Sequence, residues 1–90
     1  MTQCIWKFEL KITEEQEISM PMYAEILCVQ CQNEVGCLWA MVNPQNEKEN
    51  RIIIIRGTGH MFEKDPLKKY IGTFHISKGA LVWHVFEKVK

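Results

Sequence analysis

The segment Arg51-Ile52-Ile53-Ile54-Ile55-Arg56 decides the fold of this 90-residue chain. Four consecutive isoleucines predict a β-strand, because branching at Cβ restricts the side chain in a helix and suits a pleated surface. The run is apolar on both faces, so we expect a central strand that is covered from two sides. It is far shorter than the ~18 residues of a membrane-spanning helix.

The rest of the chain also favours strands. Trp6, Phe8, Leu10 and Ile12 alternate with polar residues, which predicts a half-buried strand. Similar patterns predict five more strands, and Pro21 marks the first of these as an edge strand because proline cannot donate to a ladder. The five expected strands cover residues 18–22, 24–32, 37–42, 70–76 and 80–89.

Short polar segments separate these strands. A turn over residues 77–79 would place Phe74 opposite Trp83 and Thr73 opposite His84. The remaining connections are expected as turns over 13–17 and 33–36, a loop over 44–50, and one helical turn over 65–69. The chain therefore predicts an all-β fold in a single domain, 1–90: a small antiparallel sandwich or partly open barrel of about seven strands, with one short helical turn.

The expected strand over 24–32 contains two cysteines. Regular alternation places Leu27, Val29 and Cys31 on one face, and Cys28 on the opposite face with its neighbours Ile26 and Gln30. The two thiols would then be unable to share a metal ion, so we expect small buried hydrophobic residues and no metal site. A redox pair, or a zinc site that combines Cys37 with a distant histidine, is the less favoured alternative.

The net formal charge of the chain is zero. No overall field attracts DNA or a membrane, and we expect neither as a partner. Residues 1–50 contain three Lys and eight Glu, a net charge of −5, whereas residues 51–90 contain eight basic and three acidic side chains, a net charge of +5. The molecule is bipolar if these halves occupy different faces, whereas an interleaved sheet would cancel the effect. The start of the chain lacks the pattern of a signal peptide, which favours the cytoplasm.

A glycine-rich break follows the isoleucine strand. The sequence Gly57-Thr58-Gly59-His60 combines backbone N–H groups, a hydroxyl and an imidazole, which together suit an anion such as phosphate. Arg56 and Lys69 would add positive charge, and Tyr70 or Trp39 could stack a base. The glycines could instead serve only to form a bulge or corner in the strand. The chain contains neither a P-loop nor a dinucleotide-binding fingerprint.

No pairing of a nucleophile with a base is evident in the sequence. His75 and His84 lie in expected strands beside apolar residues, which is typical of surface or core-edge imidazoles. Asp65 is already explained as a helix cap. We therefore expect a binding protein rather than an enzyme, without catalytic residues, cofactor or metal.

Five segments follow one another along the chain: Ala24–Leu27, Leu38–Ala40, Gly57–His60, Tyr70–Phe74 and Gly79–Glu87. In this order they resemble a family of short proteins that phages and prophages encode, which is described as a domain of unknown function. The resemblance extends from Trp6 to Glu87 and implies a viral accessory protein of the host cytoplasm. The cysteines are not part of the family's pattern.

The resemblance and the loop together suggest antagonism of host antiviral defence by sequestering a small phosphorylated, cyclic nucleotide signal. A small domain offers only a shallow pocket, so we expect a homo-oligomer that completes it, with an edge near Pro21 or in the strand over 80–89 as the interface. A protein–protein inhibitor that uses the acidic residues Glu14, Glu15 and Glu17 is one alternative. A structural phage component is another.

Overall fold

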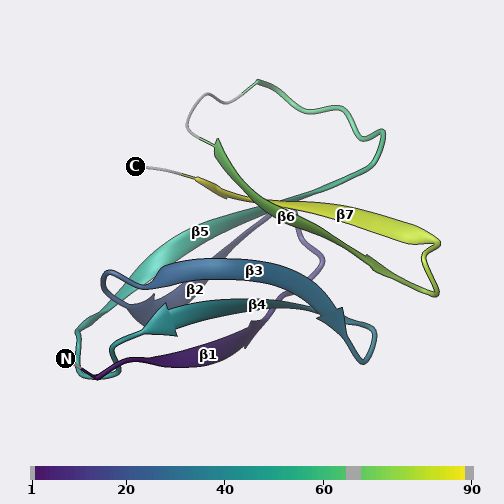
Figure 1. Ribbon diagram of the computed structural model, residues 1–90. Coiled ribbons are helices and arrows are strands. Elements are labelled where there is room, and N and C mark those ends of the chain that lie inside the picture. The colour runs from purple at the N-terminus through teal and green to yellow at the C-terminus, as the bar shows by residue number, and fades with distance from the viewer. Residues whose placement is uncertain (1, 65–67, 89–90) are drawn as a thin grey trace.

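The computed structural model describes residues 2–64 and 68–88. Seven strands form two antiparallel sheets in these residues, with the orders β1-β4-β3 and β2-β5-β7-β6 (Figure 1). Their bounds are β1 Cys4–Glu9, β2 Glu15–Pro21, β3 Glu25–Gln32, β4 Val35–Val42, β5 Lys48–Gly57, β6 Lys68–Ile76 and β7 Leu81–Lys88. The sheets do not close into a barrel, so the all-β prediction is confirmed in its sandwich form.

No helix occurs in the described residues, and none of them therefore forms a membrane-crossing helix. The sequence predicted a helical turn over 65–69, and positions 65–67 of this segment lie outside the described residues. Its last two, Lys68 and Lys69, already belong to β6. The strand prediction for this segment therefore began two residues too late.

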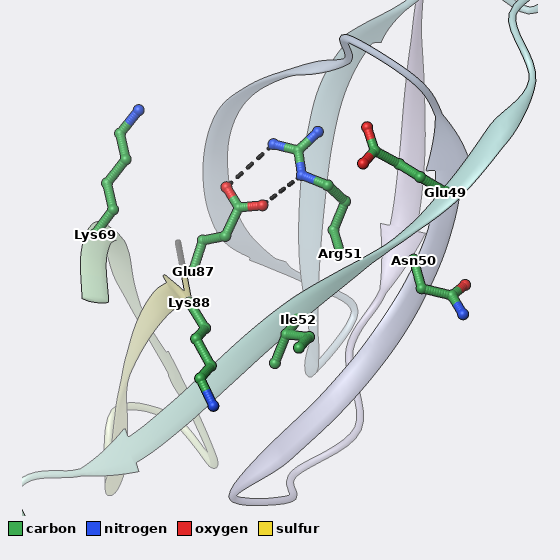
Figure 2. Close-up of a pocket in the computed structure, with 7 residues that line it drawn as sticks. All are labelled: Glu49, Asn50, Arg51, Ile52, Lys69, Glu87 and Lys88. Carbon is green, nitrogen blue, oxygen red and sulfur yellow. Dashed lines mark hydrogen bonds and ion pairs between the residues drawn. The ribbon is translucent and has the colours of Figure 1, made fainter. Parts of the chain in front are cut away.

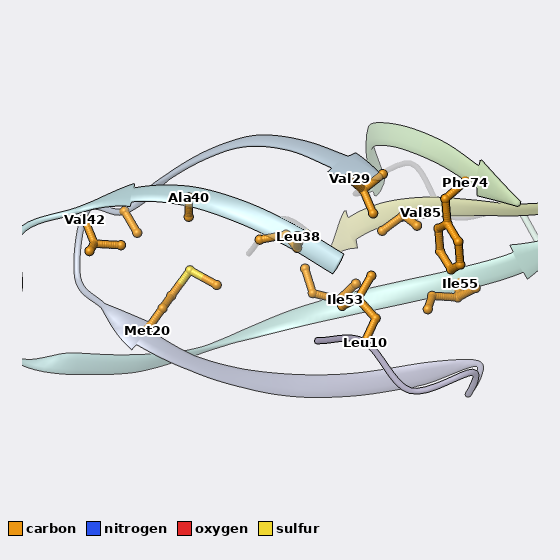
Figure 3. Packing of buried hydrophobic residues seen from close by; sticks show 11 residues of the cluster. Leu10, Met20, Val29, Leu38, Ala40, Val42, Ile53, Ile55, Phe74 and Val85 are labelled. Carbon is orange, nitrogen blue, oxygen red and sulfur yellow. The ribbon is translucent and has the colours of Figure 1, made fainter. Parts of the chain in front are cut away.

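The core lies between the two sheets (Figure 3). Leu38 and Ala40 on β4 face Met20 and Ile53 from the other sheet, and all four are fully buried. Further buried members of the cluster are Leu10, Ala24, Val29, Val42, Ile55, Phe74 and Val85. This packing explains why the isoleucine run became an inner strand, as predicted. This strand, β5, pairs with β2 and β7.

Five strands begin earlier in the chain than the sequence pattern indicated, and β2 and β5 do so by the largest margin. β2 starts at Glu15, within the expected turn over 13–17, and β5 starts at Lys48, within the expected loop over 44–50. Both extensions belong to one antiparallel ladder that runs from Glu15 opposite Ile54 to Pro21 opposite Lys48. Both strands therefore continue into polar sequence, because the backbone hydrogen bonds between them do not require apolar side chains.

A β-bulge changes the faces of β3. The register passes from Ile26 opposite Ala40 directly to Cys28 opposite Trp39, so Leu27 is the extra residue. Ile26 therefore packs against the core together with Val29, and Leu27 is 42% exposed. The predicted alternation, which grouped Leu27 with Val29, was wrong because one inserted residue reverses every side chain before it.

The two oppositely charged halves of the chain occupy largely different parts of the sandwich. The first half forms the whole β1-β4-β3 sheet and the edge strand β2, whereas β6, β7 and most of β5 come from the second half. β2 is an edge strand, as Pro21 indicated, but β7 lies between β5 and β6. The strand over 80–89 is therefore not the free edge that an oligomer interface there would require.

Candidate functional site

With the exception of Trp39, the residues that the sequence singled out lie towards the two ends of strand β7. β5 and β6 both pair antiparallel with β7, so they run parallel to each other and the intervening loop must return along the sheet (Figure 1). Gly57 lies opposite Trp83, near the start of β7, and Lys69 lies opposite Glu87, near its end. Four residues of strand separate these positions, about 13 Å.

At the first end, hydrogen bonds within the protein occupy most of the donors that were expected to hold an anion. The amides of Thr58 and His60 donate to carbonyl oxygens of Val82 and Gly57, at 3.4 and 3.1 Å. The guanidinium group of Arg56 donates to the carbonyl oxygens of its neighbour Ile55 and of residue 14, and lies 5.2 Å from the centre of the Phe62 ring. These donors therefore hold the loop to itself and to the neighbouring chain, and are not free to bind an anion.

Aromatic packing explains the glycine that begins this loop. The rings of His60 and Trp83 meet edge to face at 6.1 Å, and a Cβ on Gly57 would lie 2.6 Å from the imidazole. Gly59 adopts a φ of 84°, which closes the turn. Two cavities of about 240 and 340 Å³ flank the ring pair. His60 and Trp83 line both cavities, and the indole nitrogen of Trp83 is buried without a hydrogen-bond partner.

At the other end, a cleft lies on β5, β6 and β7, and residues 24–27 at the beginning of β3 border its larger part. It consists of two cavities of about 310 and 440 Å³, both of which Arg51, Lys69 and Glu87 line. Figure 2 shows the guanidinium group of Arg51 between the carboxylates of Glu87 and Glu49, with the chain of Lys69 at the opposite rim. In the described part of the chain, Lys69 has no hydrogen-bond or ion-pair partner, so its charge is available.

Arg51 on β5 is held in place by β7 and by the residue that precedes β3. It forms an ion pair with Glu87 on β7 through Nε and Nη2, and its Nη1 donates to the Ala24 carbonyl oxygen at 3.0 Å. The hydrogen bond to Glu87 raises the pKa of Arg51, and burial opposes this shift. Each terminal nitrogen of the guanidinium group keeps one N–H that these bonds do not use, so a ligand could accept from a preoriented cation.

Two bulges shape the mouth of the cleft. The strands β3 and β6 meet closely at Val29 and Gly72, where a Cβ on the glycine would lie 2.8 Å from Cγ1 of the valine. Each strand has its extra residue before this contact, Leu27 in β3 and Ile71 in β6. Both extra residues line the larger cavity. The bulges thus lie where the two sheet edges separate around the cleft.

A chain of hydrogen bonds joins the two ends of the site across the sheet. The Tyr70 hydroxyl lies 2.6 Å from Oγ1 of Thr73, which lies 3.0 Å from Nδ1 of His84. Nε2 of the same imidazole lies 2.7 Å from Oγ1 of Thr58. The Tyr70 ring also packs edge to face on Phe86, at 5.5 Å. The chain therefore crosses the outer face of this sheet, from Tyr70 at the rim of the cleft to Thr58 in the glycine-rich loop.

Trp39 does not join either end. It lies on β4, in the middle of the other sheet, opposite Lys7 and Cys28. Cys31, by contrast, packs against the core, in agreement with opposite faces for Cys28 and Cys31. Among the described residues, no three side chains of the types His, Cys, Asp and Glu are grouped in a way that could hold a metal ion.

Comparison with protein families adds one finding. The model of the family described as Domain of unknown function (DUF7352) matches residues 1–90. The chain belongs to this family. Neither the curated proteins nor the solved structures gave a match to this DUF7352 chain. The resemblance to a domain of unknown function, stated from the sequence, is thereby confirmed.

Sequence reasoning about this DUF7352 chain missed Arg51 and Glu87 as site residues. The sequence contained only an indirect signal for them. Each is a charged residue at the end of an apolar strand or within one, and such a residue needs a partner when it is partly buried. It also treated His84 as an isolated imidazole, although it predicted the Thr73–His84 pair correctly. The structure brings Lys69 and Tyr70 to the cleft, and leaves Arg56, Gly57, Thr58, Gly59 and His60 at the other end of β7.

Proposed function

We propose that this protein is a phage-encoded, non-catalytic binding protein that antagonises host antiviral defence by sequestering a small phosphorylated nucleotide, cyclic signals included. The observation that carries the proposal is the cleft in which Arg51 and Lys69 come together, with Tyr70 at its rim. Its cavities have the size of small-molecule sites. The phage origin and the role in defence follow from the family resemblance of the sequence.

The charges of the cleft favour a nucleotide over a simple anion. Lys69 and Lys88 would hold phosphate together with the unused N–H groups of Arg51. The carboxylates of Glu25 and Glu49 line the same cavities and balance these cations. They would repel a bare anion but accept hydrogen bonds from sugar hydroxyl or base amino groups. A ligand with both kinds of group, such as a nucleotide, matches this lining.

An aromatic residue at the rim supports the same ligand class. Tyr70 is 55% exposed, lines the larger cavity and is held against Phe86. A base that stacks on an ordered, exposed aromatic ring gains binding energy without a sequence-specific contact. Tyr70 and Lys69 thus keep the roles that the sequence suggested, whereas the phosphate site moves from the glycine-rich loop to the cleft.

Titration calorimetry of the full chain with cyclic di-AMP, AMP and inorganic phosphate tests the proposal. We expect the nucleotides to bind more tightly than phosphate, and Lys69→Glu to weaken nucleotide binding at least about tenfold, as for loss of one charged hydrogen bond. Lys78→Glu is the matched control, because Lys78 lies in the exposed turn between β6 and β7, at the far end of that hairpin. No nucleotide binding, or equal effects of both variants, would rule out the cleft.

A measurement on cells addresses the biological role. The protein would be purified from cells with an active nucleotide-signalling defence and denatured by heat, and the released material examined by mass spectrometry. We expect a stoichiometric nucleotide from the native protein and none from Lys69→Glu. If the protein still protects the phage against the host defence but releases no nucleotide, sequestration is contradicted.

The acidic edge supports a second candidate, a protein–protein inhibitor. Glu14, Glu15 and Glu17 are exposed at the beginning of the edge strand β2. An exposed row of carboxylates fits a basic surface of a defence protein. In this case, charge reversal by Glu15→Lys and Glu17→Lys would abolish protection of the phage and leave nucleotide binding unchanged. Lys69→Glu would weaken nucleotide binding and leave protection of the phage unchanged. Sedimentation of each variant would also show whether a homo-oligomer completes the site.

A further inference from the structure

Glu49 and Arg51 place opposite charges next to each other on the inner face of β5. Glu49 lies opposite Met20 and Arg51 opposite Ile18, and these two partners belong to the core or pack against it. Residues that lie directly opposite each other in an antiparallel pair share a face, so both charged side chains are on the side of the core. Both line the smaller cavity of the cleft, where Figure 2 shows the carboxylate of Glu49 beside the guanidinium group.

The two groups retain complementary capacity for hydrogen bonds. Arg51 donates to Glu87 and to the carbonyl oxygen of Ala24, and its terminal nitrogens keep N–H groups that these bonds do not use. Glu49 is half-buried, and within the described residues it has no hydrogen bond or ion pair. Its charge nevertheless contributes to the raised pKa of Arg51, which shows that the two groups are close. A ligand therefore meets a fixed donor and, next to it, a carboxylate with two free oxygens.

We propose that Arg51 and Glu49 recognise a guanine base, so that the ligand of the cleft is a guanine nucleotide. The Watson–Crick edge of guanine presents the acceptor O6 followed by two donors, N1–H and N2–H₂. Arg51 would donate to O6, and Glu49 would accept from both donors, because an ionised carboxylate can only accept. Adenine has an amino group in place of O6 and an unprotonated N1. Its amino group would meet the N–H groups of Arg51, and its N1 lone pair would meet the carboxylate.

The other groups of the cleft fit the rest of such a nucleotide. Lys69 lines both cavities, and its charge is available for phosphate. Tyr70 lines only the larger cavity and Glu49 only the smaller one, so a base that stacks on Tyr70 is a second base, as in a cyclic dinucleotide. The inference rests on the proposed function, because it assigns one base of the ligand that the cleft would hold.

Titration calorimetry of the full chain with cyclic di-GMP and cyclic di-AMP tests the inference, since these ligands differ only in their bases. We expect cyclic di-GMP to bind at least about tenfold more tightly, as for gain of one charged hydrogen bond. Lys69→Glu should weaken both ligands alike, because it affects the phosphate. Equal affinities, or tighter binding of cyclic di-AMP, overturn the guanine assignment and leave the proposed function in place. Absence of binding by either dinucleotide overturns the proposed function and the inference together.

Two amide variants complete the experiment. Glu49→Gln preserves the size of the side chain but replaces one acceptor by a donor, and should weaken cyclic di-GMP at least about tenfold and change cyclic di-AMP by no more than about twofold. Glu47→Gln is the matched control, because Glu47 is exposed two positions earlier and lines neither cavity. It should bind both ligands like the native protein. An unchanged preference for cyclic di-GMP in Glu49→Gln, or equal losses in both variants, overturns the role of Glu49.

Discussion

Val29 and Gly72 connect the edges of the two sheets, since the valine side chain fills the space that a Cβ on the glycine would need. The contact joins β3 to β6, which are not hydrogen-bonded neighbours in either sheet. From this point the bulges at Leu27 and Ile71 lead into the cleft. A glycine in the middle of a strand therefore has a packing function here, and so determines how closely the sheets approach.

Substitution of this glycine should destabilise the fold. In Gly72→Ala the new Cβ would lie 2.8 Å from Cγ1 of Val29, a distance that requires one of the strands to shift. Overpacking of this kind costs about 1–3 kcal/mol in the free energy of unfolding. Urea denaturation of the variant measures it. Val29→Ala combined with Gly72→Ala should recover part of the loss, and strictly additive effects would show that the two positions do not interact.

Loss of one partner of the Arg51–Glu87 ion pair should also be destabilising. Both side chains are less than one fifth exposed. Arg51→Met would leave the carboxylate partly buried without its partner, and we expect a loss of about 1–3 kcal/mol in urea denaturation. Arg51→Lys should not restore the native stability, because an ammonium group cannot form the two-pronged pair.

The double variant Arg51→Met with Glu87→Leu separates the charge effect from packing. It removes both charges at once and should be more stable than Arg51→Met alone. A double variant that is less stable than either single one would show that the pair contributes mainly through packing. Ligand binding by the double variant should be weak in any case, since the cleft loses its oriented cation.

Alkaline pH should lower the stability through Cys37. Burial raises the pKa of this thiol in the folded protein, and the nearby Lys7 only partly opposes the shift. The unfolded chain then loses its proton at lower pH than the folded protein. The stabilising contribution is complete below the pKa of an exposed thiol and is lost as pH rises toward the raised value. Thermal unfolding across this range should show a steeper decline for the native protein than for Cys37→Ala.

The glycine-rich loop and Trp39 should be dispensable for ligand binding. In Gly59→Arg the new Cβ meets no neighbouring atom within 4 Å, although the positive φ of this position makes the variant less stable. Trp39→Phe changes only the other sheet. We expect nucleotide affinity within about twofold of the native value for both by calorimetry. His60→Ala removes the ring that packs on Trp83 and should affect stability more than affinity. A tenfold loss of affinity in the Gly59 variant would return the phosphate site to the loop.

Local patterns were sufficient for much of the fold. The isoleucine run became an inner strand, Pro21 marked an edge strand, and the turn after Ile76 set Phe74 opposite Trp83 as predicted. Each of these depends on residues that are close in sequence or on a property of one side chain. The bulges in β3 and β6 had no such local signal, and the predicted faces of β3 failed for that reason.

The candidate site divides in the same way. The sequence by itself determined which residue types were available: an anion-friendly loop, the cation Lys69 and the aromatic Tyr70. Only the tertiary structure decided that β7 lies between β5 and β6, and so placed the loop and Lys69 four positions apart along that strand. It also brought Arg51 and Glu87, which are 36 positions apart, into one cleft. Strand order and register depend on which surfaces of the whole chain pack together, and no short window of sequence contains that energy.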